Sequence, residues 1–180
     1  MISILIPTKR GDELPKCLES IKKHTQGEYE IILLDYEGGF NQKLNDGFKR
    51  SVGEYIIILH DDNEVLEGWA DQLEDVGAFH CGELKDTNQI HGATFSGQYV
   101  FNAAPDYSAF IQMSRKVAKK VFPLDENYHS PWCADADMGR KIKKLGLKIK
   151  PLKGKIIHWH SYGAGVSHAE NERYYHGKWD

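Results

Sequence analysis

The strongest constraint on the fold is an alternation, over the first hundred residues, of short β-branched runs with segments of helical apolar spacing. Residues 2–6, 30–34 and 55–59 are nearly continuous apolar runs, which are typical of strands buried on both faces of a sheet. Between them, residues 13–25 and 41–52 place apolar side chains along one stripe at helical spacing. This alternation predicts an α/β fold in which a mostly parallel central sheet is flanked by helices.

Length and composition fit a single domain. The chain has 180 residues, of which 41% are hydrophobic, enough for one substantial core. Its apolar runs are too short to cross a bilayer and strand-like sequence begins at residue 2, so we expect neither a signal peptide nor a membrane anchor. Cys17, Cys81 and Cys133 are not spaced as a zinc site, which indicates free thiols in a reducing compartment. These features predict a cytoplasmic protein.

The second half of the chain is less regular. Residues 79–106 are rich in Gly, Asn and Gln and show no sustained period, which indicates short strands and loops. Ser130 is a possible N-cap and Gly146 a stop for the longest later helix. The tail, residues 163–180, is polar and aromatic, as in a flap or a lid. We expect two further strands and two further helices, at residues 108–113, 156–159, 115–121 and 131–145.

Acidic residues gather where the third expected strand ends. There the chain reads His60, Asp61, Asp62, Asn63 and Glu64, and ligands of open α/β sheets bind at the carboxyl ends of strands. Carboxylates this close repel one another, and a divalent cation is the simplest way to hold them together. Oxygen ligands favour Mg²⁺ or Mn²⁺, with substrate phosphates completing the coordination shell. The alternative is an Asp-rich turn that caps the next helix.

Asp35 follows the second expected strand and has two interpretations. It could accept a hydrogen bond from a nucleotide base or a ribose hydroxyl, as acids near strand ends do in other nucleotide sites. It could equally be a turn residue after a buried strand.

Asp135 and Asp137 lie at the start of an expected helix. Acids are common there because the helix dipole favours them. Residues two apart do not share a helix face, so at most one of the two is expected to point into a given pocket. That carboxylate could act as a general base toward an acceptor hydroxyl.

His158 and His160 lie two apart in an expected strand. Side chains at this spacing point to the same side, so the imidazoles could supply a metal ligand or a phosphate contact. The alternative is a buried, hydrogen-bonded histidine with a structural role.

In their order along the chain, these motifs resemble the inverting nucleotide-sugar glycosyltransferases of family 2, which have the GT-A fold. Residues 3–8 are similar to that family's opening strand, residues 30–35 to its second strand with the base-binding Asp, and residues 44–48 to its Asn-x-Gly helix. Residues 53–64 resemble the glycine-led strand that ends in the DXD metal motif. Residues 134–146 resemble the catalytic segment, and the pair His158 and His160 looks like the C-terminal histidine motif.

The resemblance implies a reaction and a role for each motif. A sugar would pass from a nucleoside diphosphate-sugar, with UDP-sugars favoured, to an acceptor hydroxyl with inversion, assisted by Mn²⁺ or Mg²⁺. Residues 1–105 would bind the nucleotide sugar, residues 106–162 would bind the acceptor and carry the catalytic groups, and residues 163–180 would form a tail or lid. Asp135 would be the base, with Asp137 in reserve. The implied metal ligands are Asp62, His158 and His160, and the implied donor contacts are Pro7, Thr8, Arg10, Asp35, Asn45 and Asp61.

Three positions depart from the family pattern. His60 stands at the first Asp of the metal motif, Tyr36 replaces a second acid after Asp35, and Ala134 replaces the Glu before the catalytic Asp. The first change leaves the metal to Asp62 and turns Asp61 toward the sugar or ribose. Two rival functions remain: a nucleotidyltransferase of similar fold, although residues 7–11 are a thin triphosphate signature, and a non-catalytic sugar-nucleotide-binding module.

The charge distribution bears on the acceptor. The formal net charge is -3, yet residues 140–155 hold eight Lys or Arg and no Asp or Glu. The other 15 basic and 26 acidic residues sum to -11. Such a run is either a solvated helix face or an anion-binding surface. The second interpretation predicts an anionic acceptor: a modified nucleic acid, a lipid-linked phosphate or an acidic glycan.

Overall fold

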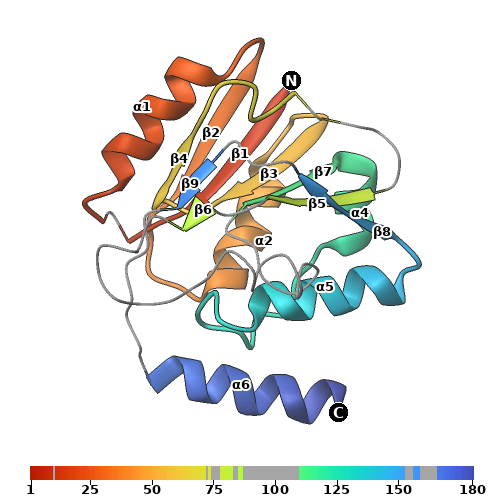
Figure 1. The fold of residues 1–180 in the computed structure, drawn as a ribbon. Coiled ribbons are helices and arrows are strands. Elements are labelled where there is room, and N and C mark those ends of the chain that lie inside the picture. Colours follow the sequence, from red (N-terminus) through yellow and green to blue (C-terminus); the bar gives the residue numbers. More distant parts are fainter. Residues whose placement is uncertain are drawn as a thin grey trace.

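A six-stranded mixed sheet forms the centre of the protein (Figure 1). The computed structural model describes residues 1–9, 11–71, 73, 78–82, 85–86, 110–152, 156–158 and 166–180. The strand order is β2-β1-β3-β7-β5-β8. Three of the strand pairs are parallel and two are antiparallel, and helices pack on both faces. The expected α/β fold is confirmed.

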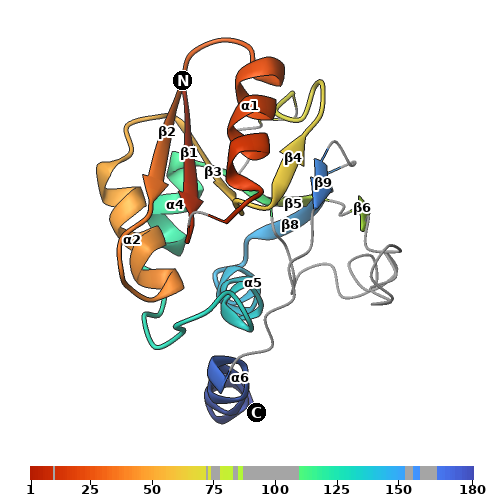
Figure 2. The same cartoon turned by 90° about the vertical axis from the view of Figure 1, so that its left-hand side faces the viewer.

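The parallel part of the sheet is the one that the apolar runs predict. β1 (Ile2–Pro7) lies between β2 (Tyr29–Leu34) and β3 (Tyr55–Leu59), and all three run in the same direction. The crossovers are α1 (Leu14–His24) and α2 (Phe40–Arg50), which lie on opposite faces of the sheet (Figure 2). Because the strands are parallel, their carboxyl ends meet at one edge.

The other half of the sheet is less regular. β7 (Phe110–Ser114) pairs antiparallel with both β3 and β5 (Ala78–Gly82), and β8 (Lys148–Leu152) pairs parallel with β5. The short helix α4 (Arg115–Val121) follows β7 directly, at the bounds expected.

A second, three-stranded sheet has the order β4-β9-β6. It consists of β4 (Asn63–Val65), β9 (Ile156–His158) and β6 (Lys85–Asp86). β9 and β4 are antiparallel, so the last strand returns to the chain segment that follows the acidic cluster.

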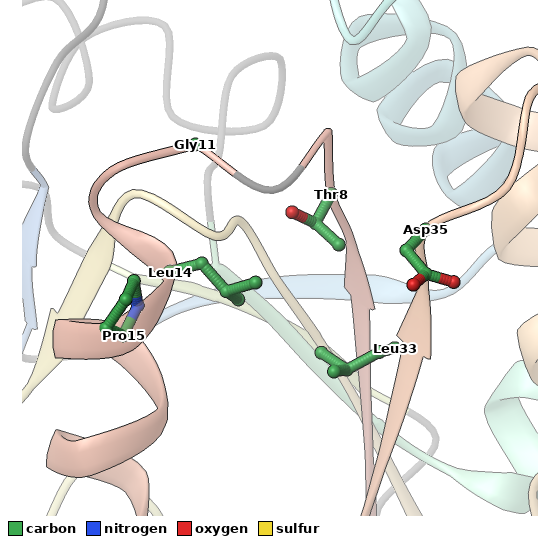
Figure 3. Close-up of a pocket in the computed structure, with 6 residues that line it drawn as sticks. All are labelled: Thr8, Gly11, Leu14, Pro15, Leu33 and Asp35. Atoms are coloured by element: carbon green, nitrogen blue, oxygen red, sulfur yellow. The ribbon is translucent and has the colours of Figure 1, made fainter.

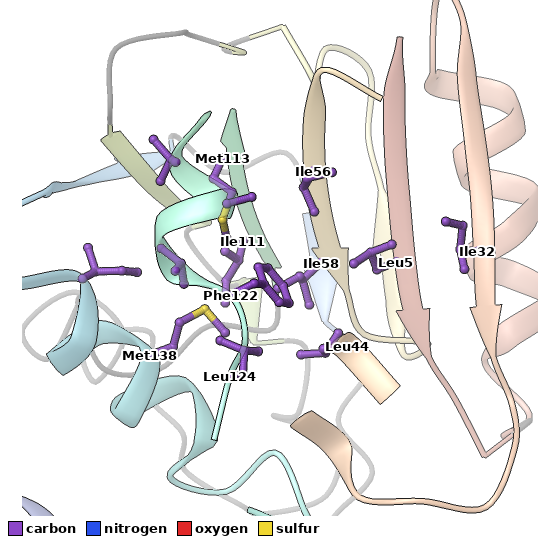
Figure 4. Packing of buried hydrophobic residues seen from close by; sticks show 14 of the residues in the cluster. Leu5, Ile32, Leu44, Ile56, Ile58, Ile111, Met113, Phe122, Leu124 and Met138 are labelled. Carbon is purple, nitrogen blue, oxygen red and sulfur yellow. The ribbon is translucent and has the colours of Figure 1, made fainter. Parts of the chain in front are cut away.

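Two apolar clusters pack on the two faces of the main sheet. Successive strand residues point to opposite sides, so Leu5 belongs to one cluster while Ile4 and Ile6 belong to the other. The first cluster, shown in Figure 4, joins the sheet to α2, α4 and α5 (Ala134–Lys144). The second joins the sheet to α1 and to the second sheet. Both clusters hold the strand ends rigidly in place.

The tail forms a helix, α6 (Val166–Trp179), which lies alongside α5 in both views (Figures 1 and 2). Asn171 of α6 is 1% exposed and donates hydrogen bonds to the carbonyls of Ser130 and Trp132 at 3.1 and 2.8 Å. Within the described part of the chain, no helix combines the length and hydropathy needed to span a membrane.

The start of α5 differs from the sequence-based expectation. The helix begins at Ala134, three residues later than expected, and its N-cap is Cys133 in the left-handed region with φ 62°. Ser130 is therefore not the cap, and its hydroxyl instead accepts a hydrogen bond from Asn171. Gly146, with φ 69°, follows the helix as expected.

Candidate functional site

A pocket of about 400 Å³ opens at the carboxyl ends of β1 and β2 (Figure 3). One wall comes from β2 and the other from the first turn of α1, and Asp35 is the carboxylate at its rim. An apolar slot with few polar groups is typical of sites for flat organic groups. Its lining residues are Thr8, Gly11, Leu14, Pro15, Leu33 and Asp35.

The acidic cluster lies beside this pocket, where β3 ends. The amide and side chain of Asn63 both donate to the carbonyl of His60, at 3.2 and 3.1 Å, which closes a tight turn around Asp61 and Asp62. The Thr8 hydroxyl donates to Asp61 Oδ2 at 2.5 Å. This hydrogen bond joins the ends of β1 and β3, so the pocket and the acidic cluster form one continuous site.

The field of the two carboxylates extends to a neighbouring thiol. Burial, with a further contribution from the charges of Asp61 and Asp62, raises the pKa of Cys17 to about 12. Cys17 is therefore a neutral, buried packing residue, consistent with the free thiol expected from the sequence.

The backbone brings His158 to the acidic cluster. In the antiparallel pair of β4 and β9, His158 is the register partner of Asn63, the residue that follows Asp62. Its side chain, like His160 and Arg10 as a whole, lies outside the described residues. The strand pairing thus places one of the two expected histidines next to the expected metal ligands.

The donor atoms suit a hard divalent cation completed by a substrate. Asp61 and Asp62 offer carboxylate oxygens at adjacent positions, and both side chains are half-buried. No trio of His, Cys, Asp or Glu among the described residues is grouped closely enough to hold a metal alone. Mg²⁺ and similar ions are commonly bound by one or two carboxylates together with substrate phosphates, which is the arrangement these residues fit.

The two acids of α5 have different surroundings. Asp137 is 3% exposed, and its Oδ1 accepts hydrogen bonds from Tyr128 Oη at 3.2 Å and Trp179 Nε1 at 2.8 Å. Lys178 Nζ lies 2.6 Å from the same oxygen. Asp135 is half-buried, and its Oδ1 accepts from the amide of Ala136 at 2.9 Å. The expectation that the two would not share a pocket agrees with this difference.

Two acidic neighbours, Asp125 and Asp137, raise the pKa of Lys178. Burial by itself would lower the pKa of Lys178, but hydrogen bonds to Asp125 and Asp137 outweigh it, so the net pKa is raised. Asp137 therefore carries a structural ion pair between α5 and α6.

Ala134 occupies the position where the resembled family has Glu. Its side chain is fully buried in a small cluster with Tyr128 and Cys133. The position contributes packing, and the start of α5 presents Asp135 as its partly exposed acid.

Asn45, one of the expected donor contacts, bonds to the segment that follows α4. Its amide donates to the Leu124 carbonyl at 3.0 Å and to Glu126 Oε1 at 2.8 Å, while its oxygen accepts from the Leu124 amide at 2.7 Å. The residue is 2% exposed. Its hydrogen-bonding groups thus hold α2 to the segment after α4.

Lys43 is a site residue that the sequence reasoning missed. It is 7% exposed, its Nζ donates to the carbonyl of Thr8 at 3.0 Å, and it lies over the ring of Tyr36 at 5.7 Å. The ammonium therefore supports the end of β1 from the α2 side. The sequence held one signal that Lys43 is buried: it lies four positions before Gly47, and residues four apart share a helix face, here the buried face of α2.

No protein-family model matches the sequence. Curated relatives include the "PGL/p-HBAD biosynthesis glycosyltransferase" of Mycobacterium bovis (strain BCG / Pasteur 1173P2) and that of Mycobacterium tuberculosis (strain ATCC 25177 / H37Ra). Each is 28% identical over 51% of this chain and 46% of its own length, so the chain spans about half the length of these relatives.

Solved structures share the fold at low sequence identity. GalNAc-T7, crystallised with UDP, GalNAc and Mn²⁺, gives a TM-score of 0.68 at 11% identity, covering 90% of this chain and 43% of that one. The catalytic domain of Drosophila β1,4-galactosyltransferase 7, in complex with xylobiose, gives 0.64 at 14% identity, covering 95% and 79%. The chain therefore has the GT-A fold that these glycosyltransferases share.

Proposed function

We propose that the protein is a glycosyltransferase that moves a sugar from a nucleoside diphosphate-sugar, with UDP-sugars favoured, to an acceptor hydroxyl. The observation that carries the proposal is the continuous site at the ends of β1, β2 and β3. There an apolar pocket with Asp35 at its rim adjoins the carboxylates of Asp61 and Asp62 through the hydrogen bond from Thr8. The curated relatives are named glycosyltransferases, and GalNAc-T7 was crystallised with UDP and Mn²⁺, which supports the same class of donor.

The nucleotide would bind across the ends of β1 and β2. Leu14, Pro15 and Leu33 supply apolar surface for a flat base, and Asp35 would accept a hydrogen bond from a base N–H or a ribose hydroxyl. Pro7 and Thr8 form the end of β1 beneath it, and Arg10 follows in the same loop. Asp61, held by the Thr8 hydroxyl, would face the ribose or the donor sugar.

Asp62, with His158 of β9 or His160 two positions further along the sequence, would hold Mn²⁺ or Mg²⁺ together with the donor diphosphate. When bound, such a cation neutralises the negative charge that develops on the leaving diphosphate. The strand register that pairs Asn63 with His158 supports this ligand set.

Asp135 would remove the proton from the acceptor hydroxyl. A base that activates a hydroxyl opposite the leaving group favours direct displacement, and hence inversion at the anomeric carbon. Asp137 is less suited to this role because it is buried and bonded to Tyr128, Trp179 and Lys178.

The basic run on α5 and after it supports an anionic acceptor or an anionic carrier of the acceptor. Its exposed lysines, Lys143 and Lys144, follow Asp135 by eight and nine residues. At 1.5 Å per residue this separation is roughly 12–14 Å along the helix axis. A modified nucleic acid, a lipid-linked phosphate or an acidic glycan could bridge that distance.

The decisive test is donor hydrolysis with and without metal. We expect release of nucleoside diphosphate that requires Mn²⁺ or Mg²⁺, and we expect Asp62→Asn to reduce it at least about a hundredfold because the cation loses a carboxylate ligand. Glu67→Gln is the matched control, since Glu67 is an exposed acid just beyond β4. It should retain full activity.

Two results would contradict the proposal. Release of pyrophosphate from a nucleoside triphosphate would indicate a nucleotidyltransferase. Binding of nucleotide sugar without any turnover, across a panel of donors and acceptors, would indicate a non-catalytic binding module.

A further inference from the structure

The side of the molecule formed by α4 and the C-terminal end of α5 carries a concentration of exposed lysines. On α4, Lys116, Lys119 and Lys120 are exposed, and their spacing of three and four places them on one helix face. On α5, Lys143 and Lys144 are exposed in the last turn. We call these five residues the basic face.

The two helices bring their parts of this face together. The Lys141 ammonium on α5 donates to the carbonyl of Pro123, two residues beyond the end of α4, at 2.6 Å. Figure 1 shows α4 and the C-terminal end of α5 on the side of the protein away from α1. The lysines of two separate chain segments therefore form one surface.

Two arginines next to the basic face bond to other parts of the protein. Arg115 donates to the carbonyl of Gly53 at 2.5 Å, and Arg140 donates to the Tyr175 hydroxyl at 2.9 Å. α4 contains no acid, and the acids of α5 are both in its first turn. Since the whole chain has a net charge of -3, the basic face opposes a protein that is otherwise acidic. This asymmetry orients the molecule toward an anionic surface.

An exposed apolar side chain lies at the end of this face. Leu145 directly follows Lys143 and Lys144, is 44% exposed, and precedes Gly146, which turns the chain. Lysines around an exposed leucine suit the boundary between lipid headgroups and acyl chains, where the ammonium groups meet phosphates and the leucine leaves water. Neither α4 nor α5 contains an aromatic residue on which a nucleic-acid base could stack.

We propose that the basic face docks the protein on a membrane surface rich in anionic lipid, with Leu145 inserted among the headgroups. Docking would turn the side bearing α4 and the end of α5 toward the bilayer. The start of α5, with Asp135, then lies within about 14 Å of the docking side, in reach of an acceptor carried by that membrane.

The test is flotation of the protein with vesicles, without donor or metal, so the outcome does not depend on the proposed transferase activity. We expect binding to phosphatidylcholine vesicles containing 30% phosphatidylglycerol, no binding to pure phosphatidylcholine, and release at high salt. The variant Lys116→Gln, Lys119→Gln, Lys120→Gln and Lys143→Gln should lose at least about tenfold in partitioning. Lys144 is left in place because it also lies over the ring of Trp179 at 5.8 Å.

A control variant changes the same total charge elsewhere. Lys16, Lys22 and Lys23 of α1 and Lys49 of α2 are exposed, and their replacement by Gln should leave vesicle binding nearly intact. Leu145→Ser should weaken vesicle binding about fivefold, because the apolar contribution is lost, while leaving binding to a DNA duplex unchanged.

Three outcomes would overturn the proposal. The first is equal binding to neutral and anionic vesicles. The second is an equal loss in the two lysine variants, which would show that total charge, and not this face, decides binding. The third is tighter binding to DNA than to vesicles with no effect of Leu145→Ser, which would make the face a nucleic-acid surface.

Discussion

Asp135 and Asp137 lie two positions apart on α5, and this spacing separates the acid that we propose as the base from one that bonds to α6. The half-buried Asp135 lies on the side of the helix that remains partly open. Asp137 points into the contact with α6, where Trp179 and Lys178 take its carboxylate. Both acids lie in the first turn of α5, yet their surroundings differ in burial and in hydrogen bonding.

Substitution of each acid by its amide tests this assignment. We expect Asp135→Asn to lower turnover by about 10²–10⁴-fold without changing the melting temperature, because a general base is removed from a partly solvated position. We expect Asp137→Asn to reduce the free energy of unfolding by about 2 kcal/mol, because a buried charge-assisted bond is lost, while turnover below the unfolding temperature stays within a few-fold. Steady-state kinetics and calorimetry on both variants measure the two effects. The reverse pattern would move the base to Asp137.

Single residues also explain one close approach in the sheet. A Cβ on Gly53 would lie 2.6 Å from the backbone nitrogen of Ser3, and the Gly53 amide donates to the Ser3 hydroxyl at 2.7 Å. The glycine at the start of β3 therefore lets this strand pass directly beside β1.

The helix α6 fastens the segment before α5 as well as α5 itself. Lys178 bridges Asp137 of α5 and Asp125 of the preceding loop, at 2.6 and 2.7 Å. The Tyr174 hydroxyl donates to Asp125 at 2.9 Å, and Asn171 bonds to the carbonyls of Ser130 and Trp132. These contacts fix the segment that leads to Asp135, so α6 supports the start of α5.

The contact of α6 with Asp125 should make stability depend on pH in the acid range. Burial alone would raise the pKa of Asp125, but hydrogen bonds from Lys178 and Asn127 lower it to about 2. Since this folded value lies below the unfolded value of about 3.9, the stabilisation is complete above about pH 5 and is lost as the pH falls toward 2. The loss should amount to about 2 kcal/mol.

Urea unfolding at pH 7 and at pH 2.5 measures this contribution. The variant Asp125→Asn should be less stable than the wild type at pH 7 and should lose about 2 kcal/mol less on acidification. Glu67→Gln, which removes an exposed acid outside this contact, should follow the wild type. An Asp125→Asn variant with the wild-type pH dependence would refute the role given to this carboxylate.

At the scale of the whole molecule, the parallel core was predictable and its surroundings were not. The runs that became β1 and β3 are buried on both faces, and β2 is an equally apolar run that is only partly buried on one face, so composition distinguishes all three. α6 escaped prediction because its tyrosines and polar residues follow no apolar stripe; it is held by hydrogen bonds to distant residues. The hydrogen bonds of Asn45 could not be predicted for the same reason, because its partner Leu124 lies 79 positions away in the sequence.

The candidate site shows the same limit. Asp35, Asp61 and Thr8 could be placed from strand ends, because parallel strands deliver their carboxyl ends to one edge. The role of Lys43 could not, because it depends on which backbone carbonyl its ammonium reaches in the folded chain.

Nucleotide binding should stabilise the molecule as a whole. With Mn²⁺ present, UDP at a hundred times its dissociation constant should raise the free energy of unfolding by about 2.7 kcal/mol. For a chain of this size that corresponds to a rise in melting temperature of about 5–10 °C. Differential scanning fluorimetry across UDP, GDP, ADP and CDP measures it, and Asp35→Asn should abolish most of the rise with UDP. A larger rise with a purine nucleotide would contradict the preference for UDP-sugars.

The hydrogen bond from Thr8 to Asp61 joins the pocket at the ends of β1 and β2 to the acidic cluster, so binding of the proposed nucleotide and binding of the proposed cation would be linked. If a bound cation raises the affinity for the nucleotide by a given factor, bound nucleotide raises the affinity for the cation by the same factor. Each ligand alone would then bind weakly, and the two together would bind tightly. The donor and its metal would enter and leave the protein as one unit.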